Sequence, residues 1–273
     1  MNEGIFYADA RAAIWTRNEN RDGLFSFLKA HGIDGFQFSD GEIYAQGEDE
    51  LLAAMKRHGM KTYMIHVFPR LMAKDDDVFE NAVKETVGKL AQLKKFDCGR
   101  LMIVPFPKSD VSGEEDAERA MARMIDGLRR IIPEAKKEGI ECYVENFSTT
   151  RLPYGKVDDV RKILDAVPEV KYVFDTANYF CIDIDPHAAY ERFRGKIDFV
   201  HVKNFKFCAE GMLLDNGRHV KSPTFDTGPM NITALFEKMA KDRLDVPYVI
   251  ELNDTVSLDD IARDAAVMKR YFG

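Results

Sequence analysis

The chain has 273 residues, close to the roughly 250 of one α/β barrel, and its 45% hydrophobic and 31% charged residues are typical of a globular protein. A net charge of −7 argues against nucleic acid as the main partner, because binding phosphates requires a basic surface. The sequence has no apolar run near the roughly 18 residues of a membrane span and no signal-peptide pattern at its start, so we expect no membrane partner and a cytoplasmic protein whose four cysteines are reduced thiols.

Short β-rich runs alternate with helical stretches along the chain, and several runs are apolar throughout, as strands buried on both faces are. The expected strands are, in order, Gly4–Ala8, Gly35–Ser39, Lys61–Phe68, Arg100–Phe106, Ile140–Asn146, Val170–Asp175, Lys196–Lys203 and Pro247–Leu252. Apolar residues spaced three and four apart predict helices over Leu51–Arg57, Val78–Lys95, Asp116–Glu138, Val157–Ala166 and Leu235–Asp242. This alternation favours a single-domain (β/α)8 TIM barrel over residues 1–273, rather than an open doubly wound sheet.

Two features of the connections carry further expectations. The segments KAHGIDGFQF, KRHGMKTYMI and KKEGIECYV share basic residues, a glycine and a following strand, so Gly32, Gly59 and Gly139 are predicted to end helices in the left-handed conformation. The longest connection without a clear pattern, Phe205–Met230, follows the seventh strand. Its length fits a lid or binding loop and, equally, a surface excursion.

Four consecutive strands, the fifth to the eighth, each end on an ionisable residue. Glu145, Asp175, His201 and Glu251 all follow apolar pairs, and the carboxyl ends of barrel strands converge on one mouth, where active sites lie. Each residue alone reads more readily as a buried or capping polar group. Three carboxylates together repel each other, however, and a divalent cation resolves that conflict. Three carboxylates and one imidazole suit Mn2+, Mg2+ or Co2+ better than a closed structural zinc site.

The same positions carry motifs of a known family. The chain resembles the xylose isomerase-like TIM barrels, which include sugar phosphate isomerases/epimerases and endonuclease-IV-like proteins. The resemblance rests on YVENF at 143–147, FDTAN at 174–178, HVKN at 201–204 and IELN at 250–253, where the family shows E-N, D-x-x-H, H-x-K-D and a final E. The architecture matches over essentially the whole chain, and the specific motifs lie in its C-terminal half.

The resemblance implies that Glu145, Asp175, His201 and Glu251 bind one divalent metal ion, with Mn2+ as the first choice and Mg2+ or Co2+ as alternatives. It also implies that the two glutamates form the acid/base pair, as in the ketose 3-epimerases of the family. Asn178 replaces a histidine that binds a second ion in the multi-metal nucleases, so we expect a mononuclear site.

Other residues are weaker candidates. For substrate contact we consider His66 at the end of the third strand, Lys203 two residues after His201, Trp15 after the first strand, and Arg151 in the loop after Glu145. Three of them have a plain structural reading as well: His66 as a core histidine, Trp15 as a packed loop residue and Arg151 as a surface cation. Asn146, Asn178 and Asn204 are expected to support the ligands from behind, and Asn204 brings no charge where the family has aspartate.

The function expected is a metal-dependent isomerase or epimerase of a sugar or polyol, which moves a proton next to a carbonyl through an enediolate. The alternative is a lyase or dehydratase, acting on a keto-polyol or an oxidised C-glycoside, which shares the first step; the C-glycoside-cleaving members would need a partner chain. An apurinic-site endonuclease is disfavoured because its multinuclear site needs several histidines and this chain has six in all. Asn178 in place of a ligand histidine and the negative net charge count against it as well. A non-catalytic barrel is disfavoured by the intact ligand set. Homo-oligomers remain open, since family members are often dimers or tetramers.

Overall fold

The chain folds as a closed barrel. A computed structural model describes residues 6–9, 21–112, 114–251 and 257–273, and within them parallel strands close in the order β1-β11-β7-β6-β5-β4-β3-β2. These strands are β1 (Phe6–Asp9), β2 (Ile33–Ser39), β3 (Lys61–Val67), β4 (Arg100–Ile103), β5 (Glu141–Glu145), β6 (Lys171–Asp175), β7 (Ile197–Val202) and β11 (Tyr248–Ile250). All eight expected strands are present, so the predicted (β/α)8 fold is confirmed.

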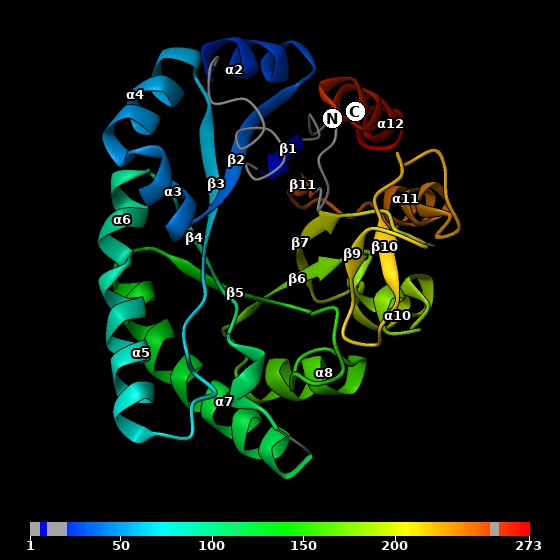
Figure 1. Cartoon of the computed structure of the whole chain (residues 1–273). Coiled ribbons are helices and arrows are strands. Elements are labelled where there is room, and N and C mark those ends of the chain that lie inside the picture. The colour runs from blue at the N-terminus through cyan, green and yellow to red at the C-terminus, as the bar shows by residue number, and fades with distance from the viewer. Residues whose placement is uncertain (1–5, 10–20, 113, 252–256) are drawn as a thin grey trace.

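Helices surround the ring of strands (Figure 1). Within the described residues they are α2 (Arg21–Ala30), α3 (Asp40–Gln46), α4 (Glu48–His58), α5 (Asp76–Gly88), α6 (Leu90–Lys95), α7 (Glu114–Lys137), α8 (Val157–Ala166), α9 (Asn178–Cys181), α10 (Pro186–Phe193), α11 (Ile232–Lys241) and α12 (Leu258–Phe272), with a 3-10 turn η1 (Lys108–Asp110). The helix predicted over Val78–Lys95 is two helices, because the first ends at Gly88 and a new one begins after Lys89. The other four predicted helices are present within a few residues of the expected bounds.

The predicted left-handed glycines are confirmed. Gly32, Gly59 and Gly139 have φ values of 81°, 59° and 72°, and each lies between a helix and the next strand. A side chain would strain this conformation, and glycine carries none.

Two of the hydrophobic clusters among the described residues are built on the barrel strands. The larger fills the space between strands and helices, and the smaller fills the barrel interior with side chains that include Tyr143, Val173, Phe199 and Val249. Side chains on a strand alternate between its two faces, so the residue two positions later also points inward. For these four strands that residue is the ionisable group at the strand end. The alternation therefore places all four groups on top of the apolar interior.

The long connection Phe205–Met230 is not an irregular loop. It contains a small antiparallel sheet, formed by β8 (Lys206–Cys208), β9 (Met212–Leu213) and β10 (His219–Lys221) in the order β8-β10-β9. Figure 1 shows β9 and β10 of this sheet in yellow, in front of α10 in this view. Met212, Leu213 and Leu214 line the same pocket as Glu145 and Glu251, so the connection forms part of a binding-pocket wall.

The structure bears on membrane-spanning helices and on the state of the cysteines. No helix among the described residues is long and apolar enough to cross a membrane. The four cysteines are free thiols, and burial raises the pKa of Cys98 to about 11 and those of Cys142 and Cys181 to about 12. Reduced thiols were expected.

Candidate metal centre

The structure brings the four strand-end residues together at the mouth of the barrel. Glu145, Asp175, His201 and Glu251 are all buried, and one potential ligand atom from each lies within 4.8 Å of the others. Their role as metal ligands stays a prediction, but the convergence on which it depends is present.

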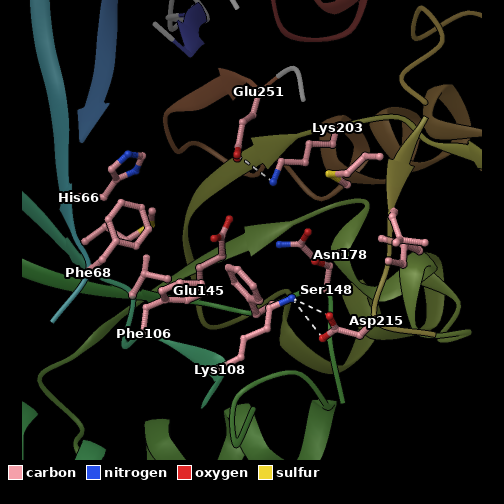
Figure 2. A pocket seen from close by; sticks show the side chains of 16 residues that line it. His66, Phe68, Phe106, Lys108, Glu145, Ser148, Asn178, Lys203, Asp215 and Glu251 are labelled. Atoms are coloured by element: carbon pink, nitrogen blue, oxygen red, sulfur yellow. Dashed lines mark hydrogen bonds and ion pairs between the residues drawn. The ribbon is translucent and has the colours of Figure 1, made fainter. Parts of the chain in front are cut away.

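Direct contacts define how these groups face one another. His201 Nδ1 lies 2.5 Å from Glu145 Oε1 and 2.9 Å from Glu251 Oε2. Lys203 Nζ lies 2.8 Å from Asp175 Oδ2 and 2.9 Å from Glu251 Oε1, and Figure 2 shows the second of these contacts. Lys203 thus shares the inward face with His201, as the strand alternation predicted, and its ammonium contacts the carboxylates.

Burial and mutual charge shift the pKa values of this cluster. Burial raises the pKa of Asp175 to about 7, in spite of Lys203 and with the help of Glu145 and Glu251. Burial alone would lower the pKa of His201, but the two glutamates outweigh it and raise that pKa to about 10. Burial likewise opposes the charge on Lys203, yet Asp175 and Glu251 raise its pKa. The carboxylates therefore favour the charged forms of His201 and Lys203.

The donor set fits a divalent cation. Three carboxylates against the one ammonium of Lys203 leave two negative charges, which a dication would balance when the imidazole is neutral. His201 would bind through Nδ1, because that nitrogen faces Glu145 and Glu251. Oxygen and imidazole donors without thiolate suit Mn2+, Mg2+ and Co2+.

A glutamine that the sequence motifs did not reveal fixes the orientation of His201. His201 Nε2 donates to Gln37 Oε1 at 2.7 Å, and Gln37 Nε2 donates to His66 Nδ1 at 3.3 Å. His66 Nε2 in turn lies 3.9 Å from Glu42 Oε2. Metal-binding histidines usually donate their second ring N–H in this manner, which leaves the other nitrogen free for the ion. Gln37 is fully buried in β2, within an otherwise apolar FQF run that was its only signal.

Asn146 and Asn178 hold Asp175 from behind. Asn146 Oδ1 accepts the backbone N–H of Asp175 at 2.9 Å, and its Nδ2 donates to the Asp175 carbonyl at 3.2 Å. Asp175 Oδ1 accepts the backbone N–H groups of Ala177 and Asn178 at 2.8 and 2.7 Å, and Asn178 Nδ2 donates to the Asn146 carbonyl at 2.8 Å. These bonds place the carboxylate as expected of supporting residues.

Three other candidates lie elsewhere. Asn204 Nδ2 donates to the carbonyls of Thr224 and Thr227 at 2.8 and 2.6 Å, so it ties down the connection after β10 rather than supporting a ligand. Arg151 is exposed and lines a different cavity, between α7 and α8. Trp15 lies outside the described residues.

A pocket of about 290 Å³ opens above the cluster. Glu145, Glu251, Lys203, Asn178 and His66 supply polar groups to it (Figure 2). Most other lining residues are apolar, and no sequence motif had pointed to them. This arrangement, a concave site with few converging polar groups, is typical of small-molecule pockets.

The comparisons with known proteins agree with this fold. The family model described as xylose isomerase-like TIM barrel matches residues 25–271, and the chain belongs to that family. No curated protein matches the sequence.

Among solved structures, the chain is similar to the IOLI protein with a bound zinc atom, at 15% identity and a TM-score of 0.77, covering 98% of this chain and 99% of that one. It is similar to the 3-keto-D-glucoside 4-epimerase YcjR from E. coli, at 19% identity and a TM-score of 0.72 over 98% and 99% of the two chains. It is also similar to the probable 3-DHS dehydratase AsbF from Bacillus anthracis, at 14% identity and a TM-score of 0.73 over 97% and 98%. At these identities the likeness supports the fold.

Proposed function

We propose that the protein is a divalent-metal-dependent sugar isomerase or epimerase that moves a proton on the carbon next to a carbonyl. The observation that carries the proposal is the buried cluster of three carboxylates and one histidine within 4.8 Å, at the floor of a pocket. The family and the epimerase among the similar structures support this class of chemistry.

Glu145, Asp175, His201 and Glu251 would hold the ion, for which Mn2+ is our first choice. When bound, a dication supplies a positive charge that polarises the carbonyl oxygen and favours an enediolate. Glu145 and Glu251 both line the pocket, so one would remove the proton from the substrate carbon and the other would return it. Lys203 and His66 would hold substrate oxygens, since both face the same pocket.

A lyase is the second candidate, and His66 is the observation that favours it. His66 lines the pocket together with both glutamates and is 2% exposed. After proton removal, a dehydratase must protonate a departing hydroxyl, and a histidine is suited to that step. A dehydratase also occurs among the similar structures.

The test combines metal analysis with isotope exchange. Purified protein would be analysed for metal content, loaded with Mn2+, and incubated in D2O with ketoses, inososes and 3-keto sugars. We expect one ion per chain and deuterium uptake, seen by NMR, at a carbon next to a carbonyl. A rising absorbance from a new conjugated carbonyl would assign the lyase instead. Protein that binds no divalent ion would contradict both candidates.

A further inference from the structure

The pocket above the metal centre divides into two zones of different chemistry. Its floor is polar, with Glu145, Glu251 and Lys203. Its more exposed lining includes Phe68, Phe106 and Leu213, which we call the apolar rim, beside the ion pair of Lys108 and Asp215. Figure 2 shows Phe68 and Phe106 on the side of the pocket that carries His66.

The apolar rim holds a disproportionate share of the exposed apolar surface. Among the described residues, the exposed large hydrophobic side chains are Tyr44, Phe68, Phe106, Phe207 and Leu213. Three of these five line this one pocket, with exposed fractions of 45% for Phe68, 37% for Phe106 and 63% for Leu213. Single exposed apolar residues are ordinary, whereas a cluster at a pocket mouth marks a binding surface.

The rim also has a geometry that suits a flat apolar group. The rings of Phe68 and Phe106 pack edge to face, with centroids 6.4 Å apart, and so form a corner of two aromatic faces. Leu213 reaches the pocket from β9 of the small sheet. The Lys108–Asp215 ion pair, at 3.0 and 3.1 Å, connects that sheet to η1 at the end of β4. The ion pair thus links the small sheet to the loop that follows β4.

The cationic side chains of the pocket form ion pairs with carboxylates. Lys203 contacts Asp175 and Glu251, and Lys108 contacts Asp215. Within the described part of the chain, these are the only lysine or arginine side chains that line the pocket. A sugar hydroxyl needs only the one remaining N–H of Lys203, whereas a phosphate monoester would have to compete with a carboxylate for either cation. The polar floor and the apolar rim together favour an uncharged substrate.

We infer that the substrate is a sugar derivative with an apolar, aryl-sized substituent, rather than a free or phosphorylated sugar. The inference rests on the proposed function for the sugar part, which would lie on the polar floor. The substituent would pack against Phe68, Phe106 and Leu213.

Calorimetric binding to the Mn2+-loaded protein tests the inference without requiring turnover. The probes are phenyl and methyl β-D-glucopyranoside, the same pair of β-D-galactopyranosides, and glucose 6-phosphate. We expect a phenyl glycoside to bind at least tenfold more tightly than its methyl partner. Tenfold corresponds to about 1.4 kcal/mol, which burial of roughly 60 Å² of apolar surface supplies.

Variants of the rim locate the effect. Phe68→Ala and Leu213→Ala remove exposed side chains, so folding should be unaffected, and each is expected to reduce the phenyl-over-methyl ratio at least threefold. Tyr44→Ala is the matched control, because Tyr44 is 87% exposed and lies outside the pocket. The Tyr44→Ala variant should bind both the phenyl and the methyl glycoside as the unmodified protein does.

Several results would overturn the inference. These are equal affinity for phenyl and methyl partners, tightest binding of glucose 6-phosphate, no binding by any probe, or a dimer in light scattering that Leu213→Ala dissociates. Deuterium exchange with a free sugar and no phenyl preference would refute the substrate class and leave the proposed function intact. A phenyl preference that depends on Phe68, without exchange on any keto sugar, would support the rim and count against the proposed chemistry.

Discussion

Two of the places where the molecule buries carboxylates contrast with each other. At the mouth of the barrel, Glu145, Asp175 and Glu251 lie together with His201 and Lys203. On the outside of the barrel, Asp264 of α12 is 1% exposed and accepts the backbone N–H of Phe225 at 2.7 Å. Burial raises the pKa of Asp264 to about 7, although this hydrogen bond opposes the shift.

The difference separates a structural from a functional use of buried charge. A single buried acid can avoid the cost of desolvation by binding a proton at neutral pH. At the mouth the pKa of Asp175 is likewise raised to about 7, but this acid lies with two further carboxylates around His201 and Lys203. An arrangement of this kind is more costly than packing requires, and it is explained if a dication and a substrate bind there.

The largest effect is expected for Glu251→Gln, which retains the shape of the side chain but can neither accept nor release a proton as a general base or acid. We expect kcat to fall by a factor of about 100 to 10,000, as loss of a general acid or base does. Metal content measured on the same sample separates a lost base from a lost ligand. Glu237→Gln, on the exposed face of α11, is the control. Full activity of Glu251→Gln would remove this residue from the acid/base pair.

Asp175→Asn should act mainly on metal affinity. The new amide still accepts the backbone N–H groups of Ala177 and Asn178, but it brings no charge to the centre. Loss of a residue that only hydrogen-bonds a metal ligand raises the Kd for the metal by up to about 100-fold. Loss of a ligand charge should cost more, so we expect the Kd for Mn2+ to rise at least about 100-fold. Asp198→Asn provides the comparison, since Asp198 pairs with Lys171 near the opposite end of the barrel. Equal affinities in the two variants would argue against the ligand assignment.

Gln37→Leu tests the hydrogen bond behind His201. Without the acceptor at 2.7 Å, the imidazole loses the bond that fixes which nitrogen carries the proton. A rise of about tenfold to 100-fold in the Kd for Mn2+ is expected. Gln37→Glu keeps an acceptor oxygen and should retain more affinity than the leucine variant. Thr86→Val, at a buried position in α5, controls for loss of a buried polar group. Titration calorimetry on all three proteins would show whether the effect belongs to the centre.

The strands and their terminal residues could be predicted because both depend on local pattern. Apolar runs indicated the barrel strands. Because side chains on a strand alternate between its two faces, the inward direction of Phe199 predicted that His201 and Lys203 also point inward. Gln37 escaped prediction because its contact with His201 joins β2 and β7, which lie on different parts of the ring. That contact follows from barrel closure and has no local signature.

Loop directions were the other gap. The small sheet in 205–230 has strands of two or three residues, too short for a periodic pattern. Asn204 occupies a motif position, yet it bonds to Thr224 and Thr227 because that sheet returns the chain beside it. Arg151 was placed near the site by sequence order alone, and the loop carries it to another cavity.

The smallest effect is expected at the lone acid, through Asp264→Asn. The folded-state pKa of about 7 lies above the ordinary 3.8, so the folded protein holds this proton more tightly than the unfolded chain. The stability that the proton contributes is complete below pH 3.8 and is lost as the pH rises towards 7. Asparagine keeps an oxygen for the N–H of Phe225 and cannot ionise.

The variant should therefore gain stability over the unmodified protein as the pH rises, by on the order of 1 kcal/mol at pH 8, or about 2–4 °C in Tm. Thermal unfolding at pH 4, 5.5 and 8 measures this, with the exposed Asp259→Asn on the same helix as control. A difference that does not change with pH would mean that Asp264 is ionised in the folded state, so that a lone buried acid need not bind a proton here.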